Sequence, residues 1–226
     1  MDLSKLKQIR AVVFDMDGLM FDSERYVKMS WTIAGEKLGY GPLGEHIGET
    51  LGLNRKDREI YFKERYGRDF PFEEFLDLYR DVYYELCGDQ GVPAKEGLHE
   101  ILEVLKSRGI KMGVATSSSQ EHAFANLRRE HITGYFQAVV TGNMIRHGKP
   151  EPDIYLEACK RLQENPCHVM ALEDALNGIR AAHRAGMMPV MIPDLVTDSR
   201  SVDDILFGKC NSLSELAEIF KAIEQG

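Results

Sequence analysis

The sequence has little cysteine, and what it has is not arranged for disulfides or metal binding. The four cysteines are Cys87, Cys159, Cys167 and Cys210, and no two of them form a C-x-x-C pair. The seven histidines do not show metal-ligand spacing either. We therefore expect neither a disulfide framework nor a structural zinc site, and we expect the thiols to stay reduced.

Long apolar runs and an excess of basic residues are missing as well. No stretch approaches the roughly 20 apolar residues of a membrane-spanning helix, and the apolar run before Asp15 is too short for a secretory signal. With 28 Lys and Arg against 36 Asp and Glu, the formal net charge is −8. Nucleic acids are bound chiefly through Lys and Arg, so that partner is disfavoured. We therefore expect a cytoplasmic protein with neither a membrane nor a nucleic-acid partner.

What the sequence does contain is an alternation of short apolar runs with amphipathic segments. The apolar runs cover residues 11–15, 111–116, 136–141, 168–173 and 188–192, and the amphipathic segments include residues 97–108, 152–163 and 177–185. Near-continuous apolar strands alternating with helices predict a parallel sheet covered by helices on both faces. The chain is therefore expected to form a three-layer α/β fold.

One interval interrupts this alternation. Residues 23–91 contain no convincing strand, but show helical periodicity over residues 24–38, 56–66 and 72–87. We therefore predict an all-helical domain of residues 23–91 inserted into a core of residues 1–22 and 92–226. Because two adjacent linkers would join the domains, this cap could open and close over the sheet.

Side chains with reactive chemistry follow several of the predicted strands. Asp15, Thr116 and the pair Glu173 and Asp174 stand at strand ends, and Lys149 lies in a later loop. Ligands of open α/β sheets bind outside the carboxyl ends of the strands, so we expect these side chains at one edge. Acids directly after buried strands are costly unless they are paired or bind a metal.

The stretch AVVFDMDGLMFDSE, residues 11–24, ends its apolar run in two acids. An aspartate is ionised at neutral pH, so Asp15 can attack a phosphate directly and form an aspartyl phosphate. A hard cation with oxygen ligands would allow this carboxylate to approach a dianion. We predict a Mg²⁺ ion held by the side chains of Asp15 and Asp174. The Asp17 carbonyl is expected as a backbone ligand, and Glu173 as a direct ligand or a contact to one.

Asp17 lies two residues beyond the proposed nucleophile, where its side chain can turn toward the leaving group. Its expected role is general acid for the departing alkoxide and then general base for the attacking water. Gly18 lets the chain bend sharply past the metal. The alternative for so short a motif is a strand-to-turn transition with solvated acids.

The stretch VATSSS, residues 114–119, is expected to bind phosphate. The hydroxyl of Thr116 and the backbone amides that follow it, beginning at Ser117, can hold phosphoryl oxygens. A helix N-cap formed by Ser118 or Ser119 is the alternative, and it is compatible with a ligand role for Thr116.

Lys149 stands in HGKPEPDIY, residues 147–155, where Pro150 and Pro152 stiffen the loop. An ammonium held in this way could neutralise both Asp15 and the incoming phosphate. The alternative is a solvated loop lysine.

Together these segments resemble the four motifs of the haloacid dehalogenase-like hydrolase superfamily. D-x-D-G lies at residues 15–18, the threonine at Thr116, the lysine of G-K-P-x-P-D at Lys149, and the acids of E-D-x-x-N-G at residues 173–174. The resemblance spans nearly the whole chain. It implies a Rossmann-like core with a small helical cap, dependence on Mg²⁺, and phosphoryl transfer through an aspartyl phosphate. The acid at Asp17 is unlike the superfamily's dehalogenases and ion-pumping ATPases.

Within the superfamily the chain resembles the β-phosphoglucomutase-like proteins, which include sugar-phosphate mutases and small-molecule phosphatases. GLNRKD, residues 52–57, resembles the mutase cap loop, which makes Arg55 a candidate substrate contact or, alternatively, a solvated arginine. The mutase has a histidine where this chain has Val27, and lysine and asparagine where it has Ser119 and Gln120. A mutase must hold two phosphates, so these departures favour hydrolysis.

Three functions follow from this comparison. The leading hypothesis is a Mg²⁺-dependent phosphatase for a small phosphomonoester, a sugar or nucleoside phosphate. The second is a hexose-phosphate mutase that needs a bisphosphate activator. The third, a non-catalytic sensor of a phosphometabolite, ranks last because the catalytic set is complete. A monomer or weak dimer is expected.

Overall fold

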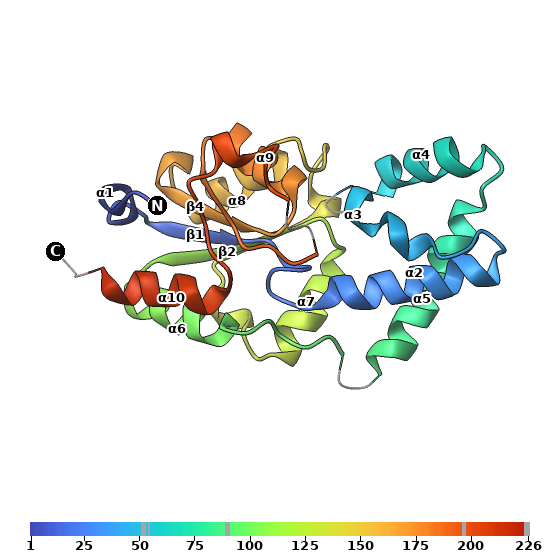
Figure 1. The fold of residues 1–226 in the computed structure, drawn as a ribbon. Helices are drawn as coiled ribbons and strands as arrows, with labels where there is room; N and C mark the ends of the chain where they lie inside the picture. The colour runs from blue at the N-terminus through green and yellow to red at the C-terminus, as the bar shows by residue number, and fades with distance from the viewer. Residues whose placement is uncertain (51–52, 54, 89–90, 196–197, 224–226) are drawn as a thin grey trace.

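A computed structural model describes residues 1–50, 53, 55–88, 91–195 and 198–223. Its centre is a six-stranded sheet with the strand order β3-β2-β1-β4-β5-β6, in which every pairing is parallel (Figure 1). The strands are β1 (Ala11–Phe14), β2 (Lys111–Thr116), β3 (Ala138–Thr141), β4 (Val169–Glu173), β5 (Met188–Met191) and β6 (Gly208–Lys209). This confirms the predicted α/β fold with a parallel sheet.

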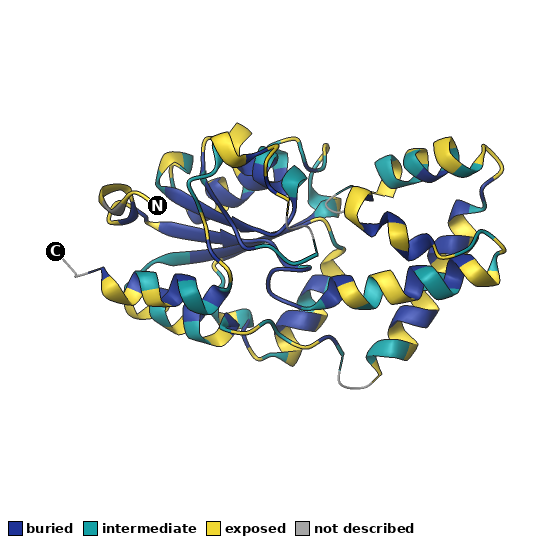
Figure 2. Ribbon diagram, in the orientation of Figure 1, coloured by how far each residue is buried: buried dark blue, intermediate teal, exposed yellow. Residues whose placement is uncertain are grey.

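Helices cover both faces of the sheet, and the alternation of side chains along each strand explains why. In β1, Val12 and Phe14 belong to the apolar cluster that includes Leu102 of α6, whereas Ala11 and Val13 face the cluster on the opposite side. All four β1 residues are fully buried (Figure 2). One face carries α6 (Leu98–Ser107), α7 (Gln120–Arg129) and α10 (Leu213–Ala222), and the other α8 (Asp153–Leu162) and α9 (Leu176–Arg184).

A separate group of helices lies between β1 and β2 in the sequence, beyond one end of the sheet (Figure 1). We call them the cap helices: α2 (Ser23–Lys37), α3 (Ile47–Thr50), α4 (Arg55–Tyr66) and α5 (Phe72–Cys87). Their apolar centre is Trp31, whose ring makes edge contacts with Phe62 at 5.4 Å and Phe75 at 5.5 Å between centroids. Because this cluster is distinct from those of the sheet, the cap helices have a core of their own.

Two adjacent segments connect the cap helices to the sheet. The amide of Asp22 donates to the carbonyl of Pro93 at 3.0 Å, and the amide of Lys95 donates to the carbonyl of Met20 at 2.8 Å. The ammonium of Lys95 also lies 2.6 Å from a carboxylate oxygen of Asp194, in the loop after β5. The two connections are therefore fastened to one another and to the sheet layer.

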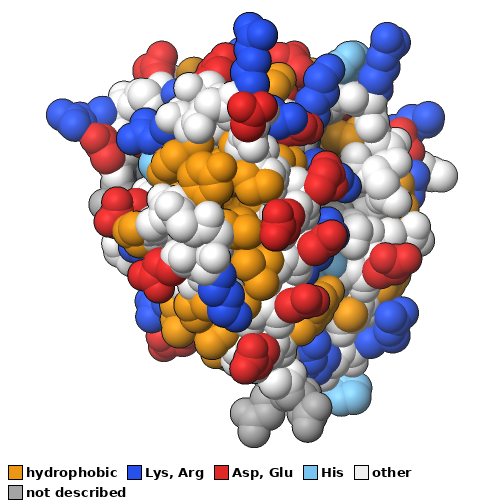
Figure 3. Space-filling view, turned by 90° about the vertical axis from the view of Figure 1, so that its right-hand side faces the viewer, with side chains coloured by type: hydrophobic (Ala, Val, Ile, Leu, Met, Phe, Trp, Pro, Cys, Tyr) orange, Lys and Arg blue, Asp and Glu red, His pale blue; other side chains and the backbone are white. Residues whose placement is uncertain are grey.

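The remaining elements are short. They are α1 (Leu3–Leu6) and five 3₁₀ turns, η1 (Leu43–His46), η2 (Thr133–Tyr135), η3 (Gly142–Met144), η4 (Pro166–His168) and η5 (Asp203–Ile205). The described helices include none with the length and apolar character needed to cross a bilayer. On the face that carries the cap helices, acidic and basic side chains are interspersed, with hydrophobic side chains exposed between them (Figure 3).

The predicted elements differ from the observed ones mainly at their ends. The run 136–141 was too long for its strand, because Phe136 and Gln137 follow the η2 turn instead of joining β3. Strand β6 was not predicted, since two residues that begin with glycine carry no periodic signal. Helix α7 was anticipated only through the helix-cap alternative at Ser118 or Ser119, and Ser119 is its N-cap. Helix α10 was missed, although Ser212 caps it.

Candidate active site

The candidate site lies at the carboxyl ends of β2, β1 and β4, which are neighbours in the sheet. Asp15 directly follows β1, while Thr116 and Glu173 are the last residues of β2 and β4. The parallel register places Phe14 beside both Val114 and Leu172, so the residues that follow these positions come out at one edge. All three side chains are buried.

Lys149 joins this edge from the loop after β3. Its ammonium donates hydrogen bonds to Asp15, to Glu173 at 2.6 Å and to the carbonyl of Ala115 at 3.2 Å. The side chain is only 2% exposed. Burial alone would lower the pKa of Lys149, but the charges of Asp15 and Glu173 outweigh burial and raise it. The lysine is therefore held as a cation between two carboxylates.

Tyr155 completes this ionic cluster from α8. Its buried hydroxyl donates a hydrogen bond to the same Glu173 oxygen that Lys149 contacts, and its ring centroid lies 5.2 Å from the Lys149 ammonium. Close packing around Glu173 extends to α9, where a Cβ at Gly178 would come within 1.9 Å of a Glu173 carboxylate oxygen. Only glycine fits there without moving the acid.

Three acids at this edge could hold a metal ion. Asp15, Glu173 and Asp174 each offer a carboxylate oxygen, and these oxygens lie within 4.8 Å of one another. Oδ2 of Asp174 is buried and has no hydrogen-bond partner among the described residues. A Cβ at Gly18 would lie 2.3 Å from that same oxygen, so the left-handed turn at Gly18, with φ of +86°, leaves room for it.

The electrostatics of this acid cluster also fit a cation. Burial raises the pKa of Asp15 to about 7, against the lowering effect of Lys149. Burial, then the charges of Asp15 and Glu173, raise the pKa of Asp174 well above its ordinary value. A divalent ion at these oxygens would favour the ionised forms. The donor set consists of oxygens alone, as Mg²⁺ prefers.

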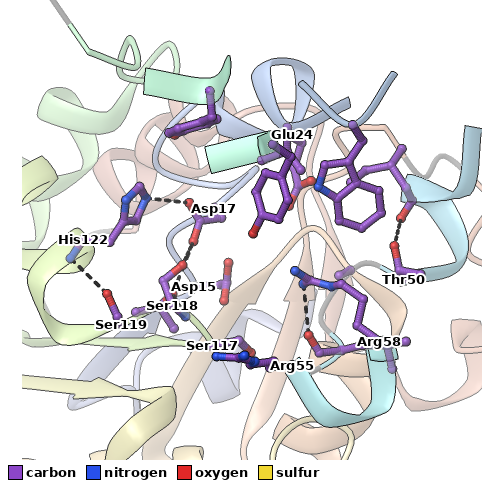
Figure 4. Close-up of a pocket in the computed structure, with 18 of the residues that line it drawn as sticks. Asp15, Asp17, Glu24, Thr50, Arg55, Arg58, Ser117, Ser118, Ser119 and His122 are labelled. Carbon is purple, nitrogen blue, oxygen red and sulfur yellow. Dashed lines mark hydrogen bonds and ion pairs between the residues drawn. The ribbon is translucent and has the colours of Figure 1, made fainter. Parts of the chain in front are cut away.

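Asp17 is placed differently from these acids, because hydroxyl groups hold its side chain. Ser118 donates to it at 2.6 Å, and Nε2 of His122 lies 3.6 Å away (Figure 4). Ser23 donates to it as well, at 2.9 Å. Burial would raise the pKa of Asp17, but His122, Ser118 and Ser23 outweigh burial and lower the pKa to about 2. The side chain is thus an ionised group separate from the three-acid cluster.

The segment predicted to bind phosphate contains one residue that caps a helix and two that remain candidates for phosphate binding. Thr116 is 1% exposed, and its hydroxyl accepts a hydrogen bond from the amide of Ser118 at 3.0 Å. Ser117 lines the cavity described below. Ser119 caps α7, accepting from the amide of His122 at 3.3 Å, so the helix-cap alternative applies to Ser119.

A cavity of about 360 Å³ separates this edge from the cap helices. Its core wall includes Asp15, Asp17 and Lys149, and its cap wall includes Glu24 and Trp31. Burial, then the nearby charge of Asp17, raise the pKa of Glu24 to about 8. The cavity therefore joins the acid cluster to polar groups of the cap helices.

Arg55 lies at the margin of this cavity (Figure 4). Its side chain is 58% exposed and forms an ion pair with Glu73. The prediction for Arg55 came from the segment 52–57, of which Gly52 and Asn54 lie outside the described residues.

The sequence did not predict several side chains that contact the candidate residues. Ser23, Ser118 and His122 contact Asp17, and Tyr155 contacts Glu173. The sequence pointed to Ser118 and Tyr155 only through their proximity to motif residues. It did not point to His122, because a histidine three positions into a helix has the same sequence pattern on any solvated helix.

Comparison with known proteins identifies the class of protein. Residues 9–186 match the family model described as haloacid dehalogenase-like hydrolase. The phosphorylated carbohydrates phosphatase of Thermotoga maritima is 31% identical over 183 residues, 79% of this chain and 82% of that protein. The β-phosphoglucomutase of Bacillus subtilis is 31% identical over 193 residues, 80% of this chain and 82% of that enzyme. The chain belongs to the haloacid dehalogenase-like hydrolases.

A solved structure agrees with this assignment. The crystal structure of CbbY from Rhodobacter sphaeroides in complex with phosphate is similar with a TM-score of 0.78 and 26% identity, covering 92% of this chain and 96% of that chain. The predicted membership in the superfamily and the predicted enzyme class are thus confirmed.

Proposed function

We propose that this hydrolase is a Mg²⁺-dependent phosphatase that cleaves a small phosphomonoester, a sugar or nucleoside phosphate, through an aspartyl phosphate. The observation that carries the proposal is the meeting of Asp15, Glu173 and Asp174 within 4.8 Å beside the buried ammonium of Lys149. The acids of such a cluster repel one another, and a site for a metal and a phosphate explains why they are together.

Asp15 is the proposed nucleophile. One of its oxygens attacks phosphorus, the bond from phosphorus to the leaving oxygen breaks, and an acyl phosphate forms on Asp15. Water then attacks the same phosphorus, and the bond to the Asp15 oxygen breaks, which releases inorganic phosphate and restores the carboxylate. Lys149 neutralises charge beside the reacting oxygen in both steps.

Asp17 is the proposed proton carrier between these steps. It gives a proton to the leaving alkoxide and takes one from the attacking water. The low pKa of Asp17 suits the second step, in which the group must begin ionised. The first step needs it protonated, and a phosphate dianion beside it shifts its pKa upward.

Mg²⁺ is proposed to bind the side chains of Asp15 and Asp174, with the Asp17 carbonyl and Glu173 as further contributors. When bound, it would neutralise phosphate charge and orient the phosphoryl group. Thr116, Ser117 and Lys149 are proposed to bind the phosphoryl oxygens. Residues 23–91 are proposed as a cap domain on a core of residues 1–22 and 92–226, in a cytoplasmic monomer or weak dimer.

A hexose-phosphate mutase is the alternative function. The similarity to a β-phosphoglucomutase and the position of Arg55 at the cavity margin favour it. Against it, Ser119 and Gln120 stand where the mutase has lysine and asparagine, and Ser119 is used as a helix cap. A non-catalytic phosphometabolite-binding protein ranks third.

Phosphate release from p-nitrophenyl phosphate tests the proposal. Activity should require Mg²⁺ and should disappear in EDTA and in Asp15→Asn. Activity that persists after all divalent metal has been removed would refute the metal-dependent mechanism. Conversion of a hexose 1-phosphate to the 6-phosphate without phosphate release, given a hexose bisphosphate, would favour the mutase.

A further inference from the structure

The cap side of the cavity contains polar groups without partners. Three polar atoms are buried without a nitrogen or oxygen partner in the described part of the chain: Nε1 of Trp31, Nε of Arg58 and the hydroxyl of Tyr83. The Tyr83 hydroxyl has only the thiol of Cys87, a weak hydrogen-bonding group, as a partner there. All three residues line the cavity, and so does Glu24, which is 8% exposed. Buried polar groups in proteins are nearly always satisfied, so this concentration in one cavity indicates a ligand.

The chemistry of these groups restricts the ligand. Nε1 of Trp31 and Nε of Arg58 only donate, and the Tyr83 hydroxyl donates and accepts. The Glu24 carboxyl accepts when ionised and can also donate when protonated. A sugar hydroxyl donates and accepts at the same atom, so neighbouring hydroxyls can satisfy a mixed set of this kind. The cavity volume, about 360 Å³, is in the range of small-molecule sites.

Two aromatic side chains of the cavity, Trp31 and Tyr83, do not offer a platform for a nucleobase, unlike Tyr84, which also lines the cavity and is largely exposed. The Trp31 ring packs edge-on against Phe62 and Phe75, and the guanidinium carbon of Arg58 lies 5.3 Å from its centroid. The Tyr83 ring contacts Tyr84 and His122. Both rings therefore contribute their polar atoms to the cavity, whereas a stacked base needs an open ring face.

The charges of the cavity also disfavour a second phosphate near Glu24. Asp17 and Asp15 lie close enough to raise the pKa of that carboxyl, so negative charge is already concentrated there. Arg55, Arg58 and Arg80 all line the cavity, and Arg58 is the one whose charge acts on Glu24. One terminal nitrogen of Arg58 donates to the carbonyl of Leu53 at 3.2 Å. A neutral polar group therefore fits this part better than another anion.

We infer that the cap side of the cavity binds a hydroxyl-rich aliphatic leaving group, that of a sugar phosphate, and that Glu24, Trp31, Arg58 and Tyr83 recognise its hydroxyls. The inference rests on the proposed phosphatase function and narrows it to one of the two substrate classes. Of these four residues, Glu24 and Tyr83 are the ones whose role in specificity a conservative substitution can test.

The test compares two substrates in matched variants. Tyr83→Phe removes one hydroxyl from the cavity, and Glu24→Gln removes the acid. Tyr40→Phe is the control, because it removes the hydroxyl of a cap tyrosine that packs against Phe70 and does not line the cavity. For each protein, kcat/KM is measured with glucose 6-phosphate and with p-nitrophenyl phosphate, which has no sugar hydroxyls. The ratio of the two should fall about tenfold in Tyr83→Phe and in Glu24→Gln, and it should not change in Tyr40→Phe.

A binding measurement separates this inference from the proposed reaction. Asp15→Asn with Mg²⁺ is titrated with glucose 6-phosphate and with adenosine 5′-monophosphate, with and without Tyr83→Phe. Tighter binding of the sugar phosphate, weakened by Tyr83→Phe, supports the inference even if the wild type hydrolyses nothing, in which case only the proposed reaction fails. Phosphatase activity with an unchanged ratio in both cavity variants, or a wild-type preference for the nucleotide, overturns the inference and leaves the reaction standing.

Discussion

Lys149 and Asp15 are 134 residues apart in the sequence, and the lysine ammonium donates a hydrogen bond to the aspartate inside the protein. The same ammonium lies 2.6 Å from Glu173. One cation thus serves two buried carboxylates, with Asp174 as a third acid nearby. A buried charge that loses its partner is much more costly than an exposed one, so this arrangement makes stability depend on Lys149.

Replacing Lys149 with methionine should lower the free energy of unfolding by about 3–5 kcal/mol, because two buried carboxylates lose their cation. Chemical denaturation in EDTA measures the change. Lys160→Met, whose side chain is 81% exposed on α8, is the control and should change stability by less than about 0.5 kcal/mol. Equal effects of the two substitutions would contradict the buried ion pair.

Asp15→Asn should abolish phosphate release, with kcat reduced at least about 10³-fold, because the amide cannot form the acyl phosphate. The fold should remain, since the substitution removes one charge from a crowded acidic cluster. Phosphate release and circular dichroism check both parts. The exposed Asp198→Asn is the matched control, and an Asp15→Asn enzyme that retains most of its activity would exclude the covalent mechanism.

Mg²⁺ should raise the unfolding free energy by about 2.7 kcal/mol at a hundredfold excess over its Kd, because it binds only the folded site. Asp174→Asn should lose most of this stabilisation. The raised pKa values of Asp15 and Asp174 mean that protons compete with the metal at low pH, so affinity should increase as pH rises through about 7. Calorimetric titration measures it; affinity that falls over this range would contradict the site.

Glu24 should make stability depend on pH. Its pKa is raised from 4.5 to about 8, so the folded protein holds the proton more tightly than the unfolded chain. That contribution to stability is complete below pH 4.5 and is lost as pH rises to about 8. Glu24→Gln does not ionise, so its stability relative to wild type should rise over this range by on the order of 4 kcal/mol. Denaturation in EDTA at several pH values measures this difference; a constant value would contradict the burial of the acid.

His122→Ala should lower kcat about tenfold, because the ring that lies 3.6 Å from the Asp17 carboxylate helps to hold this proposed proton carrier in place. His122→Gln should recover part of the loss, since an amide can still donate to Asp17. His99→Ala, whose side chain is 59% exposed, should have no effect. A loss confined to KM would show that His122 contacts the substrate instead.

Much of the fold was readable from local pattern. The run AVVF predicted a buried strand because both faces of β1 are covered, and α5 began and ended at the predicted residues 72 and 87. The acids Asp15, Glu173 and Asp174 could also be picked out from the sequence, since a carboxylate directly after a buried strand is costly without a partner.

The side chains that contact Asp17 could not be predicted in this way. Ser23, Ser118 and His122 meet at Asp17 from two different helices and a loop, and no spacing in the sequence records such a meeting. The same holds for Glu24, which in sequence looks like an ordinary acid in the first turn of α2 and is buried in the structure.

The sequence alone therefore determined strands β1 to β5, most of the longer helices and which acids end which strands, because these depend on apolar periodicity and on chemistry within a few residues. Only the tertiary structure decided which side chains face Asp17 and which polar groups of the cap helices stand without partners in the cavity. Those relationships arise where separate elements pack together, and burial there changes the charge and the hydrogen bonding of each group.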